Sequence, residues 1–521
     1  MWARHRLEWV TAVVAAVLGA VYLTFPPMGS DLAAQSARAG FFAEHGYTPI
    51  DLRWYAGVDQ LGYSLVAQPV MALLGVRVTG VLSLIASAVL LAALLRRTGA
   101  GRPWLGALVG TACIAGNLVS GRVTYGLGVT LALGAVLALT VPRLRRLAVV
   151  PALLASATSP VAGLFLGLAG AALLLSGRIA AGLLIAVPAA LPLGGIAVLF
   201  GDGGWMNISR TDTVRAVVAS LVVAALVPRR PVRIGGLLSA AGVLAAALIH
   251  TPVGLNATRL AVMFTLPALA AYAALPARLT AAAVFRGALC RGAPPVWTVL
   301  LVAAAGWWQP PVVIGDVRDI GNPAGDRSYF APLLQRLRQE TLTGRVEVPS
   351  TRDYWEAAYL GDVPLARGWL RQADIARNPL FFTDLPGASG TGVELTPESY
   401  RDWLTDRAVQ FVAVPDTELT WSGRPEAAMV SAGLPYLTTV WSDEHWRLYA
   451  VADPQPIVAR PAALVASTAA ALTFDVPAAT GVAVRVHYYR WLRASGGARV
   501  ERDGEWTVVR VPAPGRYTLT S

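Results

Sequence analysis

Repeated apolar segments of membrane length constrain this chain more than any other feature of its sequence. The first segment, "LEWVTAVVAAVLGAVYLTF", begins just after Arg6. A helix of about 20 apolar residues matches the hydrocarbon core of a bilayer. Similar windows recur up to residue 308 and predict eleven membrane spans, at 7–25, 78–95, 104–119, 123–141, 147–158, 160–176, 179–200, 213–228, 234–250, 257–276 and 295–308.

The composition agrees with a multi-pass membrane protein. Hydrophobic residues make up 55% of the 521 residues and charged residues only 14%, and a soluble domain carries nearly twice that charged fraction. The predicted fold class is therefore a polytopic α-helical membrane protein with about eleven spans. The least regular stretch is "LLASATSPVAGL", where Ser159-Pro160 breaks one apolar run into two short helices.

The arginines predict the orientation of the chain in the membrane. All 43 basic residues are arginine, and basic residues are enriched on the cytoplasmic side of membrane proteins. With the N-terminus inside, the cytoplasmic ends of the spans carry fifteen arginines, from Arg4 to Arg291, and the outer ends carry seven: Arg38, Arg53, Arg77, Arg122, Arg210, Arg215 and Arg259. This predicts a plasma-membrane protein with a cytoplasmic N-terminus and an extracytoplasmic C-terminal part.

The net charge and the supply of metal-binding side chains limit which binding partners the sequence predicts. The net charge of +12 follows from this topology and from contact with anionic lipid headgroups, so the lipid bilayer is a predicted partner and nucleic acid is not. The two cysteines and five histidines show no metal-ligand spacing, so no residue is predicted to bind a metal.

The order of the segments predicts three domains. Residues 1–308 form the transmembrane domain, and its first outer loop, 26–77, contains two amphipathic stretches that we expect to lie as helices at the membrane interface. In 309–455, "GRVEVP", "AVQFVAVP" and "WRLYAVA" read as strands, while "DRSYFAPLLQRLRQETL" and "TPESYRDWLTDRA" read as helices. This is an α/β domain outside the membrane. Residues 456–521 form a small β-module.

The first outer loop holds the most informative acid. Asp31 follows the first apolar segment in "PPMGSD". One interpretation is an N-cap of the next helix, because Asp is a preferred cap. The other is a catalytic carboxylate, and the two are compatible. "DLRWY" places Asp51, Arg53, Trp54 and Tyr55 in the same loop, which suits either a bound sugar or an anchor at the interface.

Further polar residues lie at the predicted outer ends of the spans. Arg122 occurs in "SGRVTYGLG", Asn256 and Arg259 in "TPVGLNATRL", and Asp202 and Arg210 in "GDGGWMNISRTD". Each alone is typical of a snorkelling or capping residue. Together they place cations and carboxylates on one membrane face, which favours a functional site. "STRDYWEAAYLGDVPLARGWLRQAD" adds a set suited either to carbohydrate contact or to a fold core: Arg352, Trp355, Glu356, Arg367 and Trp369.

These motifs carry a resemblance. The chain resembles actinobacterial members of the GT-C superfamily, which are membrane glycosyltransferases that use polyprenyl-phosphate sugars. The residues that carry the resemblance are the series "GSD…DLRWYAG…LGYSL", the helix junctions "SGRVTYGLG" and "TSPVAG", and "TPVGLNATRL". The loop is also similar to membrane proteins related to the 6-pyruvoyl-tetrahydropterin-synthase-related family. The GT-C resemblance implies an enzyme that transfers a sugar from a polyprenyl-phosphate donor to a glycan or glycoprotein acceptor of the cell envelope.

The resemblance also implies roles for residues. Asp31 would be the catalytic base, and Arg122 and Arg259 would bind the phosphate of the donor. Asp51 is the other acid of the "DLRWY" loop, and it lies twenty residues from Asp31, so a divalent metal ion held between two acids is left open. The remaining predicted substrate-binding residues are Asp51, Arg53, Trp54, Tyr55, Asn256, Trp355, Glu356 and Arg367.

Two alternatives belong to other classes of protein. One is a secondary transporter or flippase of envelope precursors, although such proteins usually place polar groups on broken helices near the middle of the bilayer. The acids of this chain lie in loops or at interfaces, and no internal repeat is visible. The other is a non-catalytic envelope assembly protein, for which Asp31 would serve only as a helix cap.

Overall fold

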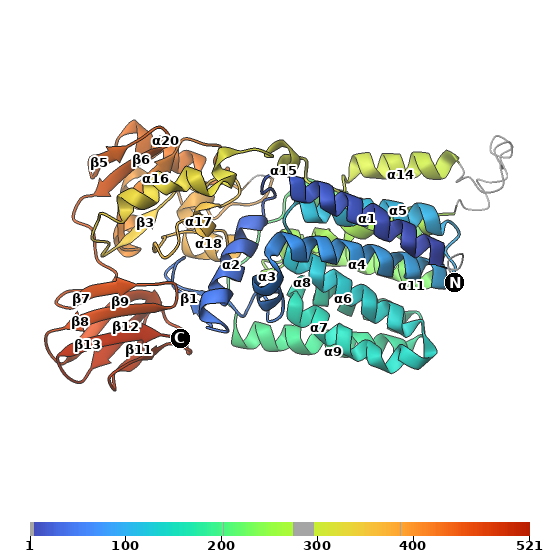
Figure 1. Cartoon of the computed structure of the whole chain (residues 1–521), viewed down its shortest axis with the longest axis horizontal. Coiled ribbons are helices and arrows are strands. Elements are labelled where there is room, and N and C mark those ends of the chain that lie inside the picture. The colour runs from blue at the N-terminus through green and yellow to red at the C-terminus, as the bar shows by residue number, and fades with distance from the viewer. Residues whose placement is uncertain (1–4, 202, 275–295, 386) are drawn as a thin grey trace.

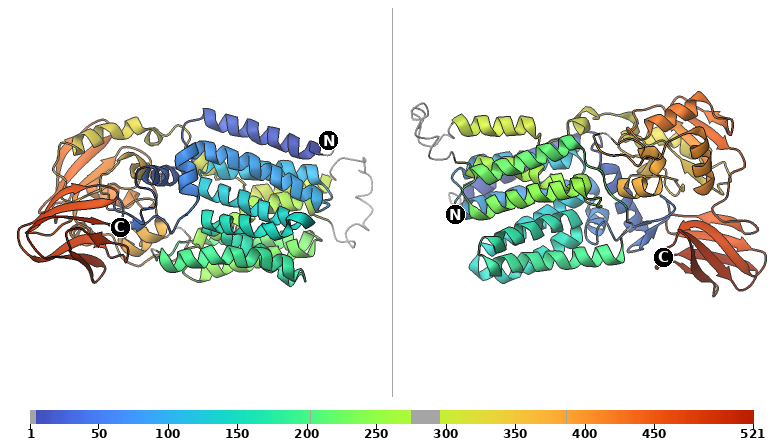
Figure 2. Two further views of the ribbon diagram at one scale, coloured as in Figure 1. Left: turned by 60° about the horizontal axis from the view of Figure 1, so that its bottom comes forward. Right: turned by 180° about the vertical axis from the view of Figure 1, so that it is seen from behind.

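The structure is a computed structural model that describes residues 5–201, 203–274, 296–385 and 387–521. It has three regions: a long helical bundle, a mixed α/β region and a β region (Figure 1). Figure 2 shows from two further sides that the bundle helices run side by side and that both strand-containing regions lie at one end of them. Asp202 lies outside the described residues, as do four of the fifteen arginines predicted to be cytoplasmic: Arg4, Arg278, Arg286 and Arg291.

Each predicted span coincides with one bundle helix. These helices are α1 (Arg6–Thr24), α4 (Val76–Arg97), α5 (Pro103–Val119), α6 (Val123–Leu139), α7 (Val149–Thr158), α8 (Pro160–Leu175), α9 (Ile179–Leu199), α10 (Arg210–Leu226), α11 (Arg230–Leu248), α12 (Arg259–Tyr272) and α14 (Val296–Trp308). Among the described residues, five helices are long and apolar enough to cross a membrane and four more are shorter apolar helices. The chain is thus a multi-pass membrane protein, whereas eleven spans and the orientation of the termini stay predictions.

Small residues and one proline shape the bundle. The predicted break at Ser159-Pro160 is confirmed, since α7 ends at Thr158 and α8 begins at Pro160, with the Ser159 hydroxyl accepting from the Ala162 N–H at 3.3 Å. Between α8 and α9, a Cβ added to Gly170 would lie 2.7 Å from the Cβ of Ala186. Small residues at such contacts let membrane helices approach closely.

The first outer loop folds between the bundle and the other two regions (Figure 1). It contains α2 (Leu32–His45), a hairpin of β1 (Ile50–Asp51) and β2 (Val58–Asp59), and α3 (Ala67–Leu74). The helices match the two predicted stretches, but α2 does not lie free at an interface. Its Leu32, Ala33 and Ala37 are buried in one cluster with Tyr329 and Trp446 of the mixed region. The apolar face of α2 is therefore buried against the mixed region and not in lipid headgroups.

The mixed region confirms the predicted strands and helices of 309–455. Its four-stranded sheet has the order β3 (Arg345–Glu347), β4 (Val409–Pro415), β6 (Trp446–Val451) and β5 (Leu437–Ser442). β3 pairs with β4 in parallel, and the other pairs are antiparallel. The helices include α15 (Ile314–Arg318), α16 (Arg327–Leu337), α17 (Glu356–Tyr359), α18 (Arg371–Arg377), α19 (Pro397–Asp406) and α20 (Arg424–Ala432).

The β region confirms the strand-rich character predicted for 456–521. One sheet has the order β10 (Arg493–Ala494), β13 (Gly515–Thr520), β8 (Ala471–Val476) and β7 (Ala463–Ser467), and the other has β11 (Arg499–Asp503), β12 (Trp506–Val511) and β9 (Thr480–His487). The inward residues of both sheets share one buried cluster, which includes Phe474, Val484 and Leu519. Ile50 and Leu52 of the outer loop join this cluster, so the loop is held by the β region as well.

Candidate active site

A cavity of about 610 Å³ lies where the bundle meets the mixed region. It is surrounded by the start of α2, the α5–α6 turn, the 3-10 turn η3 (Gly254–Thr258) with the start of α12, the segment after α14 and one wall of the mixed region. Its polar lining residues are Ser30, Asp31, Tyr63, Arg122, Thr124, Tyr125, Ser159, Asp212, Arg215, Asn256, Thr258, Arg259, Gln309, Arg352, Tyr354, Trp369, Arg371 and Gln372.

Asp31 occupies the N-cap position of α2 but does not act as a cap. Its side chain makes no capping hydrogen bond. The Oδ2 atom instead lies 2.9 Å from Nη2 of Arg259 and 3.3 Å from Nε of Arg122, and its side chain is 29% exposed. The carboxylate is therefore turned from its own helix towards the two arginines that the sequence singled out.

Two interlocked turns fix the position of Asp31. The Asp31 N–H donates to the carbonyl of Ser120 at 3.1 Å, so the start of α2 is tied to the α5–α6 turn that precedes Arg122. Gly29 has φ +105°, and a Cβ there would overlap the carbonyl oxygen of Val119. Only glycine tolerates both this conformation and this approach.

Asp316 supports the same turn from the other side. It lies in α15, directly after the last bundle helix, and its Oδ1 accepts from the Ser30 N–H at 3.3 Å. Burial raises the pKa of Asp316, opposed by Ser120 and Arg122, and the nearby charge of Asp31 adds to the rise. Sequence reasoning missed this residue, although an acid that follows the last apolar segment at the outer side was a usable signal.

The cavity is cationic. Its lining includes five arginines and two aspartates, and Arg122 and Arg259 share the single carboxylate of Asp31. Asp31 carries one negative charge and the two arginines carry two positive charges, so these three side chains together have a net charge of +1. The arrangement suits an anion that presents several oxygens, since guanidinium groups bind phosphate through charge-assisted hydrogen bonds. Asn256 lies beside them, with its Nδ2 3.3 Å from the sulfur of Met206.

The outer loop and the mixed region together contribute an aromatic wall. Tyr63 and Trp369 contact each other edge to face with ring centroids 5.3 Å apart, and the guanidinium of Arg38 stacks within 4.8 Å of both rings. Tyr354 has φ +59°, a strained conformation for a bulky residue and one that is found at functional sites. Its hydroxyl accepts from Arg371 at 3.4 Å. Sequence reasoning missed Tyr354, Arg371 and Gln372.

The "DLRWY" residues do not line this cavity. Asp51 and Arg53 form a buried ion pair of 2.7 Å, which Gln60 joins through its amide. Trp54 and Tyr55 are 1% and 2% exposed, in the core between α2 and the mixed region. These side chains do not reach the cavity because the mixed region packs onto the loop and buries them. Their role is therefore structural.

The predicted set from the mixed region is likewise buried. Trp355 stacks on Tyr359 with centroids 4.8 Å apart. Glu356 accepts from the Thr351 hydroxyl, and burial raises the pKa of Glu356 to about 7. Arg367, whose side chain is 1% exposed, is surrounded by three acids: Glu347, Asp374 and Glu426. These residues hold the fold together, whereas their neighbours Arg352 and Trp369 do line the cavity.

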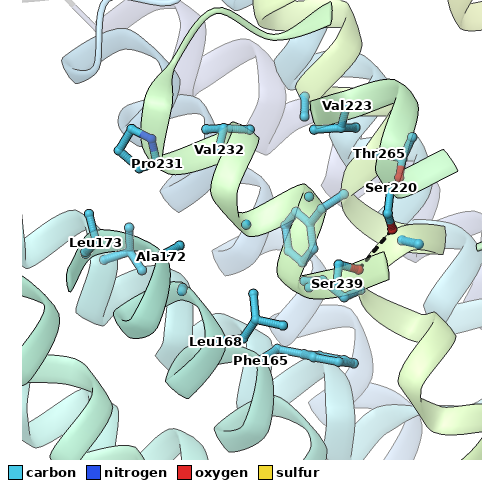
Figure 3. A pocket seen from close by; sticks show the side chains of 18 residues that line it. Phe165, Leu168, Ala172, Leu173, Ser220, Val223, Pro231, Val232, Ser239 and Thr265 are labelled. Carbon is cyan, nitrogen blue, oxygen red and sulfur yellow. Dashed lines mark hydrogen bonds between the residues drawn. The ribbon is translucent and has the colours of Figure 1, made fainter. Parts of the chain in front are cut away.

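Two apolar cavities lie among the bundle helices. One of about 280 Å³ lies among α8, α10, α11 and α12, and Figure 3 shows its lining, including Phe165, Leu168 and Val232. The Ser220 and Ser239 hydroxyls, 3.0 Å apart, satisfy each other there. A second, of about 230 Å³, shares Phe165, Leu168 and Ser239 with the first and reaches Val253 and Ala257.

These two cavities follow α11 from Pro231 to Ile249. At the helical rise this is about 27 Å, close to the thickness of the hydrocarbon core. At the η3 end, Ala257 lines the second apolar cavity, and the preceding residue, Asn256, lines the polar cavity. The cationic cavity therefore lies beside one end of an apolar seam that these two cavities form along the bundle.

The donor set does not fit a divalent metal ion. The Oδ2 atom of Asp31 is paired with two arginines, and Asp51 is paired with Arg53 outside the cavity. Within the described ranges there is no group of three or more His, Cys, Asp or Glu side chains that could hold a metal ion. Stabilisation of negative charge here falls to arginine.

The chain matches no protein-family model and no curated protein. Among solved structures it is similar to the arabinofuranosyltransferase AftD from Mycobacteria, with 17% identity, a TM-score of 0.46, and coverage of 87% of this chain and 40% of that one. It is also similar to ArnT from Cupriavidus metallidurans in the apo state, with 13% identity, a TM-score of 0.42, and coverage of 86% and 98%.

The chain thus spans about 40% of the length of the arabinofuranosyltransferase. Each TM-score is below 0.5, so the likeness carries no argument about activity, and the function must rest on the cavity itself.

Proposed function

We propose that this protein is a membrane glycosyltransferase that moves a sugar from a polyprenyl-phosphate donor to an extracytoplasmic acceptor of the cell envelope, a glycan or glycoprotein. The observation that carries the proposal is the side chain of Asp31. It leaves its capping position to meet Arg122 and Arg259 in a polar cavity. A residue that served only as a cap would point the other way.

The two parts of the cavity system match the two parts of such a donor. The phosphate suits the arginine pair, which holds more positive charge than Asp31 neutralises. The isoprenoid chain suits the apolar seam beside α8, α11 and α12, because burial of each methylene contributes about 0.8 kcal/mol. A donor that arrives within the membrane also suits an outer active site, which has no access to cytosolic nucleotide sugars.

The reaction then follows from the geometry. Donor phosphate displaces the carboxylate of Asp31 from part of its contact with the arginines and frees it to act as general base. Asp31 takes the proton of the acceptor hydroxyl, and the hydroxyl oxygen forms a bond to the anomeric carbon. The bond from that carbon to the phosphate oxygen breaks, and the electron pair leaves with polyprenyl phosphate. Arg122 and Arg259 stabilise the charge that develops on this leaving group.

The aromatic wall places the sugar. Tyr63 and Trp369 offer aromatic surface in the same cavity as the arginine pair, and the hydroxyl of Tyr354 and the amide of Gln372 offer hydrogen bonds. A small number of polar groups among aromatic surfaces is the usual composition of a site that fixes a ligand in one orientation.

The test is the fate of a labelled donor. Full-length protein in nanodiscs is incubated with a panel of polyprenyl-phosphate sugars, labelled in the sugar, and with envelope glycan as acceptor. The expected result is that label moves to glycan in equal amount to the polyprenyl phosphate released. Movement of the intact donor or glycan across a vesicle membrane without a new covalent bond would instead show a transporter, and binding without either event would show an assembly protein.

A further inference from the structure

A second polar cavity, of about 440 Å³, lies between the β region and the outer end of α9. Figure 1 shows these two parts of the chain facing each other below the outer loop. The cavity is lined by residues from the outer loop, α9, α18 and the β region: Asp59, Val198, Leu199, Gly201, Arg377, His487, Tyr488, Tyr489, Arg490, Trp491, Arg502 and Glu505. The reaction proposed above uses none of them.

The cavity is held in shape by contacts across its base. Trp491 of the β region stacks on Phe200, which follows α9, with ring centroids 5.4 Å apart. Arg490 donates to the carbonyl of Val198 at 3.2 Å, and Arg377 donates to the carbonyl of Gly57 at 2.7 Å. The β region is therefore fixed against both the bundle and the outer loop.

The lining has the chemistry of a saccharide site. Tyr488 and Trp491 supply aromatic surface, while Asp59, Arg502 and Glu505 supply charges of both signs. A sugar is a polyol that both donates and accepts hydrogen bonds, and its C–H faces pack on aromatic rings. The lining carries three arginines, Arg377, Arg490 and Arg502, against two carboxylates, a smaller excess of positive charge than the five arginines and two aspartates of the first cavity. A phosphate or acidic headgroup therefore suits this cavity less well than it suits the first one.

The second cavity is a neighbour of the first. The Oδ1 atom of Asp59, which lines the second cavity, accepts from the N–H groups of Leu61 and Gly62 at 2.8 and 3.0 Å. Gly62 lines the first cavity, and a Cβ on it would overlap the carbonyl oxygen of Phe200. One short turn thus forms a wall of both cavities.

A helix forms a second common wall. Arg371 at the start of α18 lines the first cavity, and Arg377 at its end lines the second. Six residues of helix span about 9 Å. The two cavities are therefore close enough for one short chain of sugars to reach both.

We infer that the second cavity is a distal saccharide-binding site for the acceptor, one that takes an oligosaccharide either free or as the head of a glycolipid. This inference rests on the proposed function. The terminal sugar of the acceptor lies at Asp31, and the sugars behind it pass the Asp59–Gly62 turn and bind between Trp491 and Arg502.

The test measures binding without turnover. The wild-type protein in nanodiscs, without any donor, is titrated with mannose and arabinofuranose oligosaccharides of one to six residues. The same sugars are presented as glycolipids in the nanodisc. The variants are Trp491→Ala and Arg502→Gln. The control is Arg510→Gln, an exposed arginine of the same sheet that pairs with Glu501 and does not line the cavity.

The expected result is that oligosaccharides bind more tightly than single sugars, and that each cavity variant weakens this binding about tenfold, the loss of one good contact. Arg510→Gln binds as wild type. Binding of glycolipids alone, or of both forms, supports the site and identifies its source. The inference is overturned if no member of the panel binds, if Trp491→Ala and Arg502→Gln bind as wild type, or if sugar-free anionic lipid competes fully.

This outcome is separate from that of the proposed function. Saccharide binding with no sugar transfer under any donor would remove the glycosyltransferase and keep the site. Transfer with a cavity that binds nothing would do the reverse.

Discussion

Replacement of Arg259 by Gln tests the assignment of the phosphate site. Nη2 of Arg259 lies 2.9 Å from Oδ2 of Asp31, and its side chain is 17% exposed. Arg122 approaches the same oxygen at 3.3 Å, so Asp31 keeps one cation when the other is removed. The folded state should therefore lose little stability, about 1 kcal/mol or less for a partly exposed pair.

The loss for a bound phosphate is larger. A hydrogen bond to a charged group contributes about 1.5–3 kcal/mol, and Gln removes the charge. Binding of polyprenyl phosphate should weaken roughly 10- to 100-fold. Calorimetric titration of nanodisc-embedded protein measures this, with Arg77→Gln as the control. Arg77 donates to the Tyr22 and Phe25 carbonyls and does not line the cavity. Wild-type affinity in a well-folded Arg259→Gln protein would refute the phosphate site.

Three further outcomes follow from named contacts. Gly29→Ala should cost about 1–3 kcal/mol of stability and displace Asp31, because its Cβ meets the Val119 carbonyl at φ +105°; thermal unfolding and sugar transfer should both fall. Arg367→Met should cost about 3–5 kcal/mol, because three buried acids lose their cation, while transfer per folded molecule stays near wild type. Burial raises the pKa of Glu356 to about 7, so the folded state binds the proton more tightly than the unfolded state, and stability should fall as pH rises from about 4.5 to 7; Glu356→Gln should flatten this part of the thermal-unfolding profile.

The bundle could be predicted from sequence because its signals are local. An apolar window determines a helix whatever lies beside it, and Ser159-Pro160 determines a break. Asp31, Arg122 and Arg259 could be grouped because each lies at the outer end of a predicted span, and outer ends meet at one membrane face. The structure brings these three into contact.

The remainder of the site depends on long-range docking. Trp355 and Trp369 occur in one stretch with similar neighbours, yet the first is 3% exposed in the core and the second lines the cavity. The packing of the mixed region on α2 decides which indole is buried in the core and which lines the cavity. No local sequence pattern predicts this packing. The same docking buries Trp54 and Tyr55 and brings Tyr354 and Arg371 to the cavity.

The most direct test of the account is the rate of sugar transfer by Asp31→Asn. The Asp31 side chain makes no capping hydrogen bond. Replacement by Asn should therefore leave helix α2 intact and remove only the carboxylate that acts as the base. The account predicts a folded protein that still binds polyprenyl phosphate and transfers sugar roughly 10²-fold or more slowly. Asp212→Asn, at an acid of the same cavity that accepts from Ser209, should transfer at close to the wild-type rate. Normal turnover by folded Asp31→Asn protein would contradict the assignment of Asp31 as the catalytic base.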